Sequence, residues 1–149
     1  MNVSRYKCSV LVVDDEPDVL AVLAAQLAGD FEVLTAPDAA GARAALAERS
    51  VEIVISDLNL PDESGLDLLE WVRRTAPRTA RVLLTGANQL DFAVDAINQC
   101  QVHRLVLKPW RPEDLIQSLR TISRSLLLER SHEQILDELR RLNLELERR

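Results

Sequence analysis

The stretch VLVVDDEPD at residues 10–18 joins an apolar run to three adjacent carboxylates. The Val and Leu side chains are typical of a buried strand, whereas Asp14, Asp15 and Glu16 are like charges that repel one another where that strand ends. A strand end packed against a core solvates such charges poorly, so a favourable partner must offset the cost. A cation is the simplest partner, and the stretch therefore predicts a buried strand that ends in a cation site.

Two hydrophobic patterns alternate over the rest of the first 110 residues. Short runs rich in Val, Leu and Ile predict strands at 9–13, 31–36, 51–57, 80–85 and 103–107. The amphipathic stretches between them predict helices at 17–29, 38–49, 64–76 and 90–100. Strands that are apolar throughout and alternate with helices are typical of a parallel sheet covered on both faces. The sequence thus predicts a doubly wound α/β fold with a five-stranded parallel sheet and five helices, the last extended beyond the domain.

Single residues mark the expected helix ends. Pro17 suits a first helical position, Asp38 and Ser64 are good N-caps, and Gly29 and Pro77 suit positions just past a helix.

Composition and charge exclude several classes of protein. Residues 1–110 hold 10 Lys and Arg against 16 Asp and Glu, and residues 111–149 hold eight of each, so no basic face for direct nucleic-acid binding is expected. No apolar stretch is long enough to cross a membrane or to act as a signal peptide, which predicts a cytoplasmic protein. Cys8 and Cys100 are far apart and are expected to be buried free thiols.

Polar residues stand where four of the five predicted strands end, namely Asp14 and Asp15, Asp57, Thr85, and Lys108. The carboxyl ends of parallel strands meet at one edge, and the functional crevice of such folds lies there. Three carboxylates would be balanced by a divalent ion and Lys108, and Mg²⁺ prefers such oxygen ligands. Asp57 would then remain ionised and could attack a phosphoryl group, with Lys108 neutralising the developing charge and Thr85 detecting the product.

The motifs VVDDE, SDLNLPDESG, LLTG and LKPW, in this order and spacing, resemble the flavodoxin-like receiver domain of two-component response regulators. The resemblance implies that Asp57 is the phosphoacceptor and that Asp14 and Asp15 hold Mg²⁺ with Asp57 and the carbonyl of Asn59. It also implies a switch role for Thr85, a phosphoryl-binding role for Lys108, and a cis peptide before Pro109.

Two positions depart from the usual pattern of that family. Leu105 stands where an aromatic ring commonly moves together with the hydroxyl of Thr85, so the aromatic half of the switch is in question. Ala87, with Asn59, occupies a position expected to tune the lifetime of the phosphoryl group. A phosphorylation-independent interaction module and an aspartyl-nucleophile phosphatase are therefore kept as alternatives, although the phosphatases place their nucleophile after the first strand.

After Pro112 the sequence contains no Gly or Pro, which predicts one helix to the end of the chain. Its first part is expected to dock on the sheet through Leu115, Leu119, Ile122 and Leu126. Downstream, an offset heptad-like stripe is formed by Leu128, Ile135, Leu139, Leu142 and Leu146. The stripe favours a parallel two-helix coil between protomers, and Asp137 with Arg141 and Glu145 with Arg149 are expected to support the helix.

These patterns predict a receiver over residues 8–124 and a helical linker or coiled coil over 125–149. The expected partners are a sensor histidine kinase or phosphotransfer protein, a second copy of the chain, and an output domain after residue 149. The stretch AINQCQVHRLVLKPW is similar to receivers that precede HD-GYP phosphodiesterase, transcription-activator or kinase modules. The chain is expected to be a signalling phosphoacceptor and not an enzyme.

Overall fold

The computed structural model describes residues 7–148, apart from the side chains of Phe92, Ala93 and Ala96. Its strands are β1 (Ser9–Val13), β2 (Glu32–Ala36), β3 (Ile53–Asp57), β4 (Ala80–Gly86) and β5 (Arg104–Lys108). Its helices are α1 (Pro17–Leu27), α2 (Ala39–Glu48), α3 (Gly65–Thr75), the 3₁₀ turn η1 (Ala87–Gln89), α4 (Leu90–Cys100) and α5 (Pro112–Glu147). Every predicted strand and helix is present, and boundaries differ by at most two residues.

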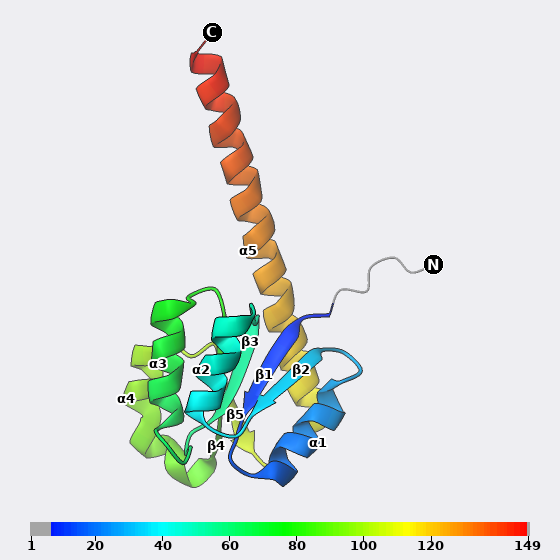
Figure 1. Cartoon of the computed structure of the whole chain (residues 1–149), viewed down its shortest axis with the longest axis vertical. Helices are drawn as coiled ribbons and strands as arrows, with labels where there is room; N and C mark the ends of the chain where they lie inside the picture. The colour runs from blue at the N-terminus through cyan, green and yellow to red at the C-terminus, as the bar shows by residue number, and fades with distance from the viewer. Residues whose placement is uncertain (1–6, 149) are drawn as a thin grey trace.

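The five strands form one parallel sheet in the order β2-β1-β3-β4-β5 (Figure 1). The chain first builds outward from β1 to β2 and then crosses back to β3, so the strand order reverses between β1 and β3. The doubly wound fold predicted from the sequence is therefore confirmed. In such sheets this reversal opens a crevice at the carboxyl ends of the strands.

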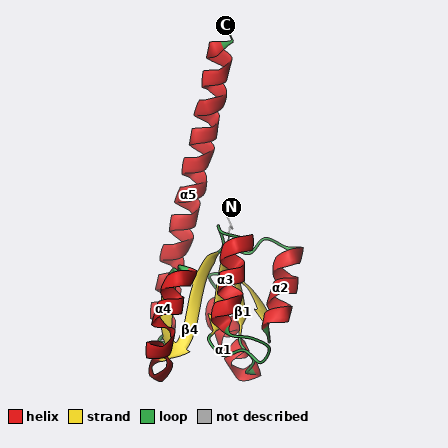
Figure 2. Ribbon diagram, turned by 90° about the vertical axis from the view of Figure 1, so that its left-hand side faces the viewer, coloured by secondary structure: helices red, strands yellow, loops and turns green. Residues whose placement is uncertain are grey.

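Helices cover both faces of the sheet (Figures 1 and 2). Alternate residues of β1 supply the two cores: Val10 and Val12 pack with α1 and α5, whereas Leu11 and Val13 pack with the helices on the opposite face. The buried contacts of α1 and α5 belong to one core, and those of α2, α3 and Cys100 at the end of α4 belong to the other. Both faces of β1 are thus buried, which accounts for its continuous apolar sequence.

The predicted helix signals act as expected at most ends. Pro17 begins α1, and Ser64 accepts a hydrogen bond from the backbone N–H of Leu66 at 3.1 Å. The Asp38 carboxylate accepts one from Gly41 at 2.7 Å, and both oxygens of Asp62 accept backbone N–H groups of α2 at 3.0 Å. Asp62 thereby ties the loop after β3 to the first turn of α2, a link that local sequence patterns did not predict.

Helix α5 has two different parts. Leu115, Leu119 and Leu126 are buried against the sheet, and Ile122 packs beside them, as predicted. Farther on, the helix projects from the globular body (Figure 1). Within the described residues, ion pairs between side chains three positions apart support the projecting part: Arg140 pairs with Asp137, and Arg141 pairs with Glu138. The expected pair of Asp137 with Arg141 is replaced by these two. The expected Glu145–Arg149 pair lies outside the described residues.

Both cysteines are buried free thiols, Cys8 in one core and Cys100 in the other. Among the described helices, none combines the length and the apolar character needed to span a bilayer.

Candidate functional site

The carboxyl edge of the sheet brings together three of the predicted acids. Asp14 follows β1 directly and is fully buried, Asp57 is the last residue of β3, and Asp15 is exposed beside them. One carboxylate oxygen from each of the three lies within 4.8 Å of the others. Two carboxylates at about 4 Å repel one another by roughly 4 kcal/mol near a protein surface, so this cluster is costly unless cations balance it.

Lys108, the last residue of β5, supplies one cation. Its Nζ lies 2.8 Å from Asp57 Oδ1 and 3.6 Å from Asp14 Oδ2. Burial disfavours the charged ammonium, but the hydrogen bond to Asp57 and the charges of Asp57 and Asp14 outweigh it, so the pKa of Lys108 is raised. Lys108 is followed by the cis peptide to Pro109 that the sequence resemblance predicted.

Asp14 is the least solvated member of the cluster. Burial raises the pKa of its carboxyl, the backbone N–H of Glu16 opposes that shift by donating to Oδ1 at 2.9 Å, and the nearby carboxylate of Asp57 adds to it. Its Oδ2 is buried and has no hydrogen-bond donor among the described residues. A buried carboxylate that has one oxygen without a donor among the described residues and clusters with two further carboxylates fits a hard divalent cation such as Mg²⁺.

The backbone around Asp57 is held by an unusually close approach of α3. The Gly65 N–H donates to the Leu58 carbonyl at 2.7 Å, and the Ser56 hydroxyl donates to the Asp57 carbonyl at 2.9 Å. A methyl group on Gly65 would overlap the carbonyl oxygen of Asp57. Gly65 is therefore required for this loop to close, a role that its place in the motif SDLNLPDESG does not reveal without the fold.

Thr85 is fully buried near the end of β4, one residue after Leu84, which pairs with Asp57 on β3. Its hydroxyl lies 3.3 Å from the side-chain oxygen of Gln89 and 3.5 Å from the Gly86 carbonyl, to which it can donate. The hydroxyl is thus bonded within its own loop and not to Asp57. Gln89 was not among the predicted site residues, and its amide becomes visible as a partner only once η1 folds back over Thr85.

The remaining predicted residues surround this centre. Asn59 is exposed in the loop after β3 and pairs with Ser64 as an isolated bridge, and Ala87 is exposed at the start of η1. Leu105 lies half-buried on β5 and packs against the core on the α3 side. The structure therefore brings Asp14, Asp15, Asp57 and Lys108 into one cluster and places the other four around it.

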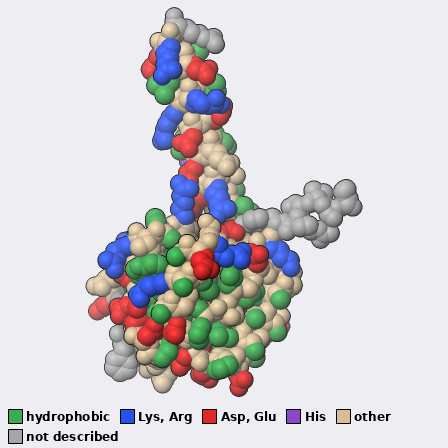
Figure 3. Space-filling model, viewed as in Figure 1, with side chains coloured by type: hydrophobic (Ala, Val, Ile, Leu, Met, Phe, Trp, Pro, Cys, Tyr) green, Lys and Arg blue, Asp and Glu red, His purple; other side chains and the backbone are tan. Residues whose placement is uncertain are grey.

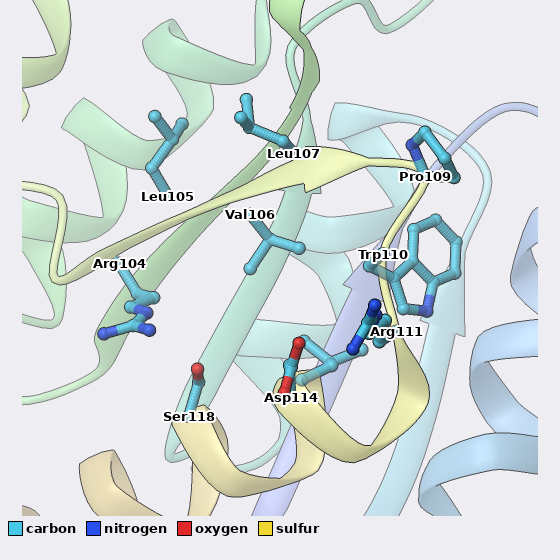
Figure 4. Close-up of a pocket in the computed structure, with 10 residues that line it drawn as sticks. Arg104, Leu105, Val106, Leu107, Pro109, Trp110, Arg111, Asp114 and Ser118 are labelled. Carbon is cyan, nitrogen blue, oxygen red and sulfur yellow. The ribbon is translucent and has the colours of Figure 1, made fainter.

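A hollow of about 320 Å³ lies elsewhere, between the edge strand β5 and the start of α5 (Figure 4). Arg104 lies at one end of this hollow and Trp110 at the other. None of the three clustered acids lines it. This hollow is therefore separate from the acidic edge.

Trp71 and Trp110 are packing residues. Trp71 packs against the second core beneath the guanidinium of Arg43, 5.4 Å from its ring centre. Trp110 packs against the first core and donates to Gln26 at 2.8 Å.

Comparison with known proteins agrees with this geometry. Hydrogenase transcriptional regulatory protein HoxA from Cupriavidus necator is 32% identical over 117 residues, which cover 78% of this chain and 24% of HoxA. Transcriptional regulatory protein KdpE from Mycobacterium tuberculosis is 37% identical over 118 residues, 77% of this chain and 50% of KdpE. The chain thus spans a quarter to a half of the length of these curated relatives.

Solved structures give the same result. The signal receiver domain of an HD domain-containing protein from Pseudomonas fluorescens Pf-5 matches with a TM-score of 0.79 and 33% identity, covering 88% of this chain and 98% of that one. The structure of an adenylate cyclase from Rhodopirellula baltica matches with a TM-score of 0.81 and 27% identity over 89% of this chain. The family model for the response regulator receiver domain matches residues 10–120 of this chain, and this range includes every predicted site residue. This chain therefore belongs to the response regulator receiver domains of two-component systems.

Proposed function

We propose that Asp57 accepts a phosphoryl group in a Mg²⁺-dependent reaction and that the chain acts as a phosphorylation-controlled switch. The observation that carries the proposal is the contact of Lys108 with Asp57 at 2.8 Å inside a cluster that leaves Asp14 Oδ2 without a hydrogen-bond donor among the described residues. Lys108 balances one negative charge, and the remaining acids form a ligand set that a divalent ion would complete. The residues proposed to hold Mg²⁺ are Asp14, Asp15, Asp57 and the backbone carbonyl of Asn59.

The donor is proposed to be the phosphohistidine of a sensor kinase or a phosphotransfer protein. A carboxylate oxygen of Asp57 forms the new bond to phosphorus while the bond from phosphorus to the histidine nitrogen breaks. The imidazole leaves with the electron pair and takes up a proton from water. Lys108 is positioned to bind the transferred oxygens, and Mg²⁺ would neutralise part of their charge when bound.

The switch is proposed to begin at Thr85. An added phosphoryl group would bring a charge of about −1.5 to −2 near a hydroxyl whose hydrogen-bond partners among the described residues are Gln89 and Gly86. Rotation of that hydroxyl toward the new anion would replace a bond of 3.3 Å with a charge-assisted one. Converting a population from 1:99 to 99:1 needs about 5.5 kcal/mol, to which the contacts of Thr85 and Lys108 would contribute.

The C-terminal helix is proposed to connect the receiver to an output domain. We place the receiver at residues 8–124 and a helical linker at 125–149 that leads toward an output domain and pairs with a second copy. HoxA and KdpE are named as transcriptional regulators, which makes a transcriptional output one candidate. We propose a cytoplasmic location and a signalling role without turnover of a separate substrate, in keeping with the family.

Leu105 supports the alternative of a phosphorylation-independent interaction module. It packs against the core with a branched aliphatic side chain where an aromatic ring would be expected to move with Thr85. If this alternative holds, Asp57→Asn will leave partner binding unchanged while abolishing phosphorylation.

Acetyl phosphate tests the proposed chemistry directly. Intact mass spectrometry is expected to show one added phosphoryl group on the wild type in the presence of Mg²⁺ and none after chelation. Asp57→Asn should remove the added mass, whereas Asp67→Asn, an exposed acid in the first turn of α3, should retain it. Equal labelling of the wild type and Asp57→Asn would overturn the assignment.

A further inference from the structure

The solvent-facing side of α5 changes character where the helix leaves the globular body. Alongside the body this side carries the exposed polar residues Gln117, Thr121 and Arg124. Beyond the body the same side carries Leu128, 70% exposed, followed by Ile135 and further leucines. Figure 3 shows hydrophobic side chains among charged ones along the projecting part of the helix. A helix that stayed in water would have no physical reason for this change.

The apolar side points away from the sheet. Leu126 is buried against the core, whereas Leu128, two residues later and about 200° around the helix, is exposed. On the other side of the helix, Arg130 and Glu133 form ion pairs with Glu52 and Arg78 of the body at 3.7 and 2.7 Å. The apolar side is therefore free of the chain's own body within the described residues and can meet another molecule.

We propose that residues 128–146 form a parallel, in-register coiled coil with a second copy of this chain. The proposal makes the dimer of the proposed function specific, and its test does not depend on phosphorylation. With heptad positions written abcdefg and His132 at position a, the seam takes its other a residues from Leu139 and Leu146. Its d residues are Leu128, Ile135 and Leu142.

Charge complementarity favours a second copy in the parallel orientation. In parallel coils a residue at g faces the residue five positions later, at e, on the second helix. Arg124, which lies just before this segment, then faces Glu129 of the second copy, and within the segment Ser131 faces Leu136 and Glu138 faces Asn143. These contacts include one opposite-charge pair and no like-charge pair. An antiparallel seam would instead bring Glu138 against Glu138.

His132 provides a second reason for the parallel orientation. It is exposed on the apolar side, between Leu128 and Ile135. A polar residue at a single a position is a known determinant of register, because it is tolerated best opposite its own copy. In a parallel, in-register pair His132 faces His132, whereas an antiparallel seam places it opposite Leu142. The seam is shorter than three heptads, so we expect a dimer that dissociates on dilution.

Sedimentation of the full, unphosphorylated chain tests the seam. The wild type is expected to show a monomer–dimer equilibrium, which Leu139→Lys should weaken by about 100-fold because two ammonium groups would meet in the core. Leu144→Lys is the matched control: Leu144 is 54% exposed against 53% for Leu139, but lies off the seam. Equal dimerisation of both variants, or a wild type that stays monomeric at the highest attainable concentration, would overturn the proposal.

Cross-linking tests the orientation. Under mild oxidation Leu142→Cys is expected to form an intermolecular disulfide, because position d faces its own copy in a parallel pair, whereas Leu144→Cys should not. Dimers of Leu142→Cys that fail to cross-link would refute the parallel register. Acetyl phosphate labelling separates this inference from the proposed function. Normal labelling of Leu139→Lys with lost dimerisation supports the coil, whereas a wild type that dimerises but takes up no label would count against the proposed function alone.

Discussion

The acidic edge of the sheet and the projecting part of α5 differ in how far each is completed by residues of this chain. At the edge, three strands bring Asp14, Asp57 and Lys108 within ion-pair distance, so this chain would supply nearly all of the groups that the proposed chemistry needs. Along the helix, leucines such as Leu139 and Leu142 remain more than two-fifths exposed. Under the proposed function the first region lacks only an ion and a phosphoryl donor, and under the proposed coil the second region lacks a second copy of the chain.

The two regions also lie at opposite ends of the body. The acids follow the carboxyl ends of the strands, but α5 leaves the body beside Glu52, just before β3 begins (Figure 1). A signal that starts at Asp57, as proposed, would therefore have to pass through the packed length of α5, whose Leu115 and Leu119 belong to the core beside β1. Because of this separation, a substitution in one region does not directly contact residues of the other region.

The largest effect is expected at Gly65, where the edge depends on close packing. Gly65→Ala would force a methyl group into the Asp57 carbonyl and should lower the free energy of unfolding by about 3 kcal/mol or more. Chemical denaturation measures the change. Gly29→Ala is the control, because nothing lies within 4 Å of its added methyl group, and it should be neutral or slightly stabilising. Similar losses in both variants would show that the close approach to Asp57 is not the cause.

Truncating a buried or an exposed leucine of α5 should change the free energy of unfolding by amounts that differ nearly as much. Leu119→Ala removes a fully buried side chain and should cost about 3 kcal/mol of unfolding free energy. The same truncation at Leu144, which is exposed, should cost less than about 0.5 kcal/mol. The two variants, compared by denaturant midpoint at a concentration where the chain is monomeric, measure how far α5 contributes to the body. Equal costs would mean that the projecting part packs against the body.

A smaller change of opposite sign is expected at Asp14. Asp14→Asn removes a charge whose buried oxygen has no donor among the described residues, and should stabilise the metal-free fold by about 1 kcal/mol. Mg²⁺ should raise the melting temperature of the wild type and of the control Asp67→Asn, but not that of Asp14→Asn. A full Mg²⁺ response in Asp14→Asn would remove this residue from the ligand set.

The smallest expected effect is a loss of folding stability at acidic pH. Burial and the charge of Arg81 lower the pKa of His103, whose Nδ1 accepts the Arg81 backbone N–H at 3.0 Å. The unfolded chain therefore binds the proton more readily, and the contribution of His103 to stability is lost as the pH falls from 6.5 toward the lower folded value. Because the ring is partly exposed, we expect a loss of only about 0.5 kcal/mol near pH 5. His103→Gln should lose less stability over that range, and an identical pH profile would exclude His103 as the source.

The sequence predicts the fold and the central cluster well because their signals are local. Four of the five strands are apolar runs that end in a polar residue, so the positions of Asp14, Asp57 and Lys108 follow once the strands are known to be parallel. The roles of Gly65 and Gln89 are different, since they depend on how a loop returns to a distant strand. No spacing in the sequence reports that the methyl group missing from Gly65 would meet Asp57.

The helix shows the same limit in another form. The change of face between Leu126 and Leu128 follows from helical periodicity and agrees with the observed burial. The ion pairs of Arg130 with Glu52 and Arg78 with Glu133 join residues far apart in sequence, so periodicity alone could not predict them. They show that contact between α5 and the body continues past residue 124.

Locating the phosphoryl group tests the central claim most directly. After reaction with acetyl phosphate and Mg²⁺, borohydride reduction converts an aspartyl phosphate to homoserine, and peptide sequencing by mass spectrometry then identifies its position. We expect homoserine at residue 57 alone, and none when Mg²⁺ is chelated or when Lys108 and Asp14 are both replaced. Homoserine at another aspartate, or an unchanged yield at residue 57 without Mg²⁺, would contradict the assignment of this edge as a magnesium-dependent phosphoacceptor site.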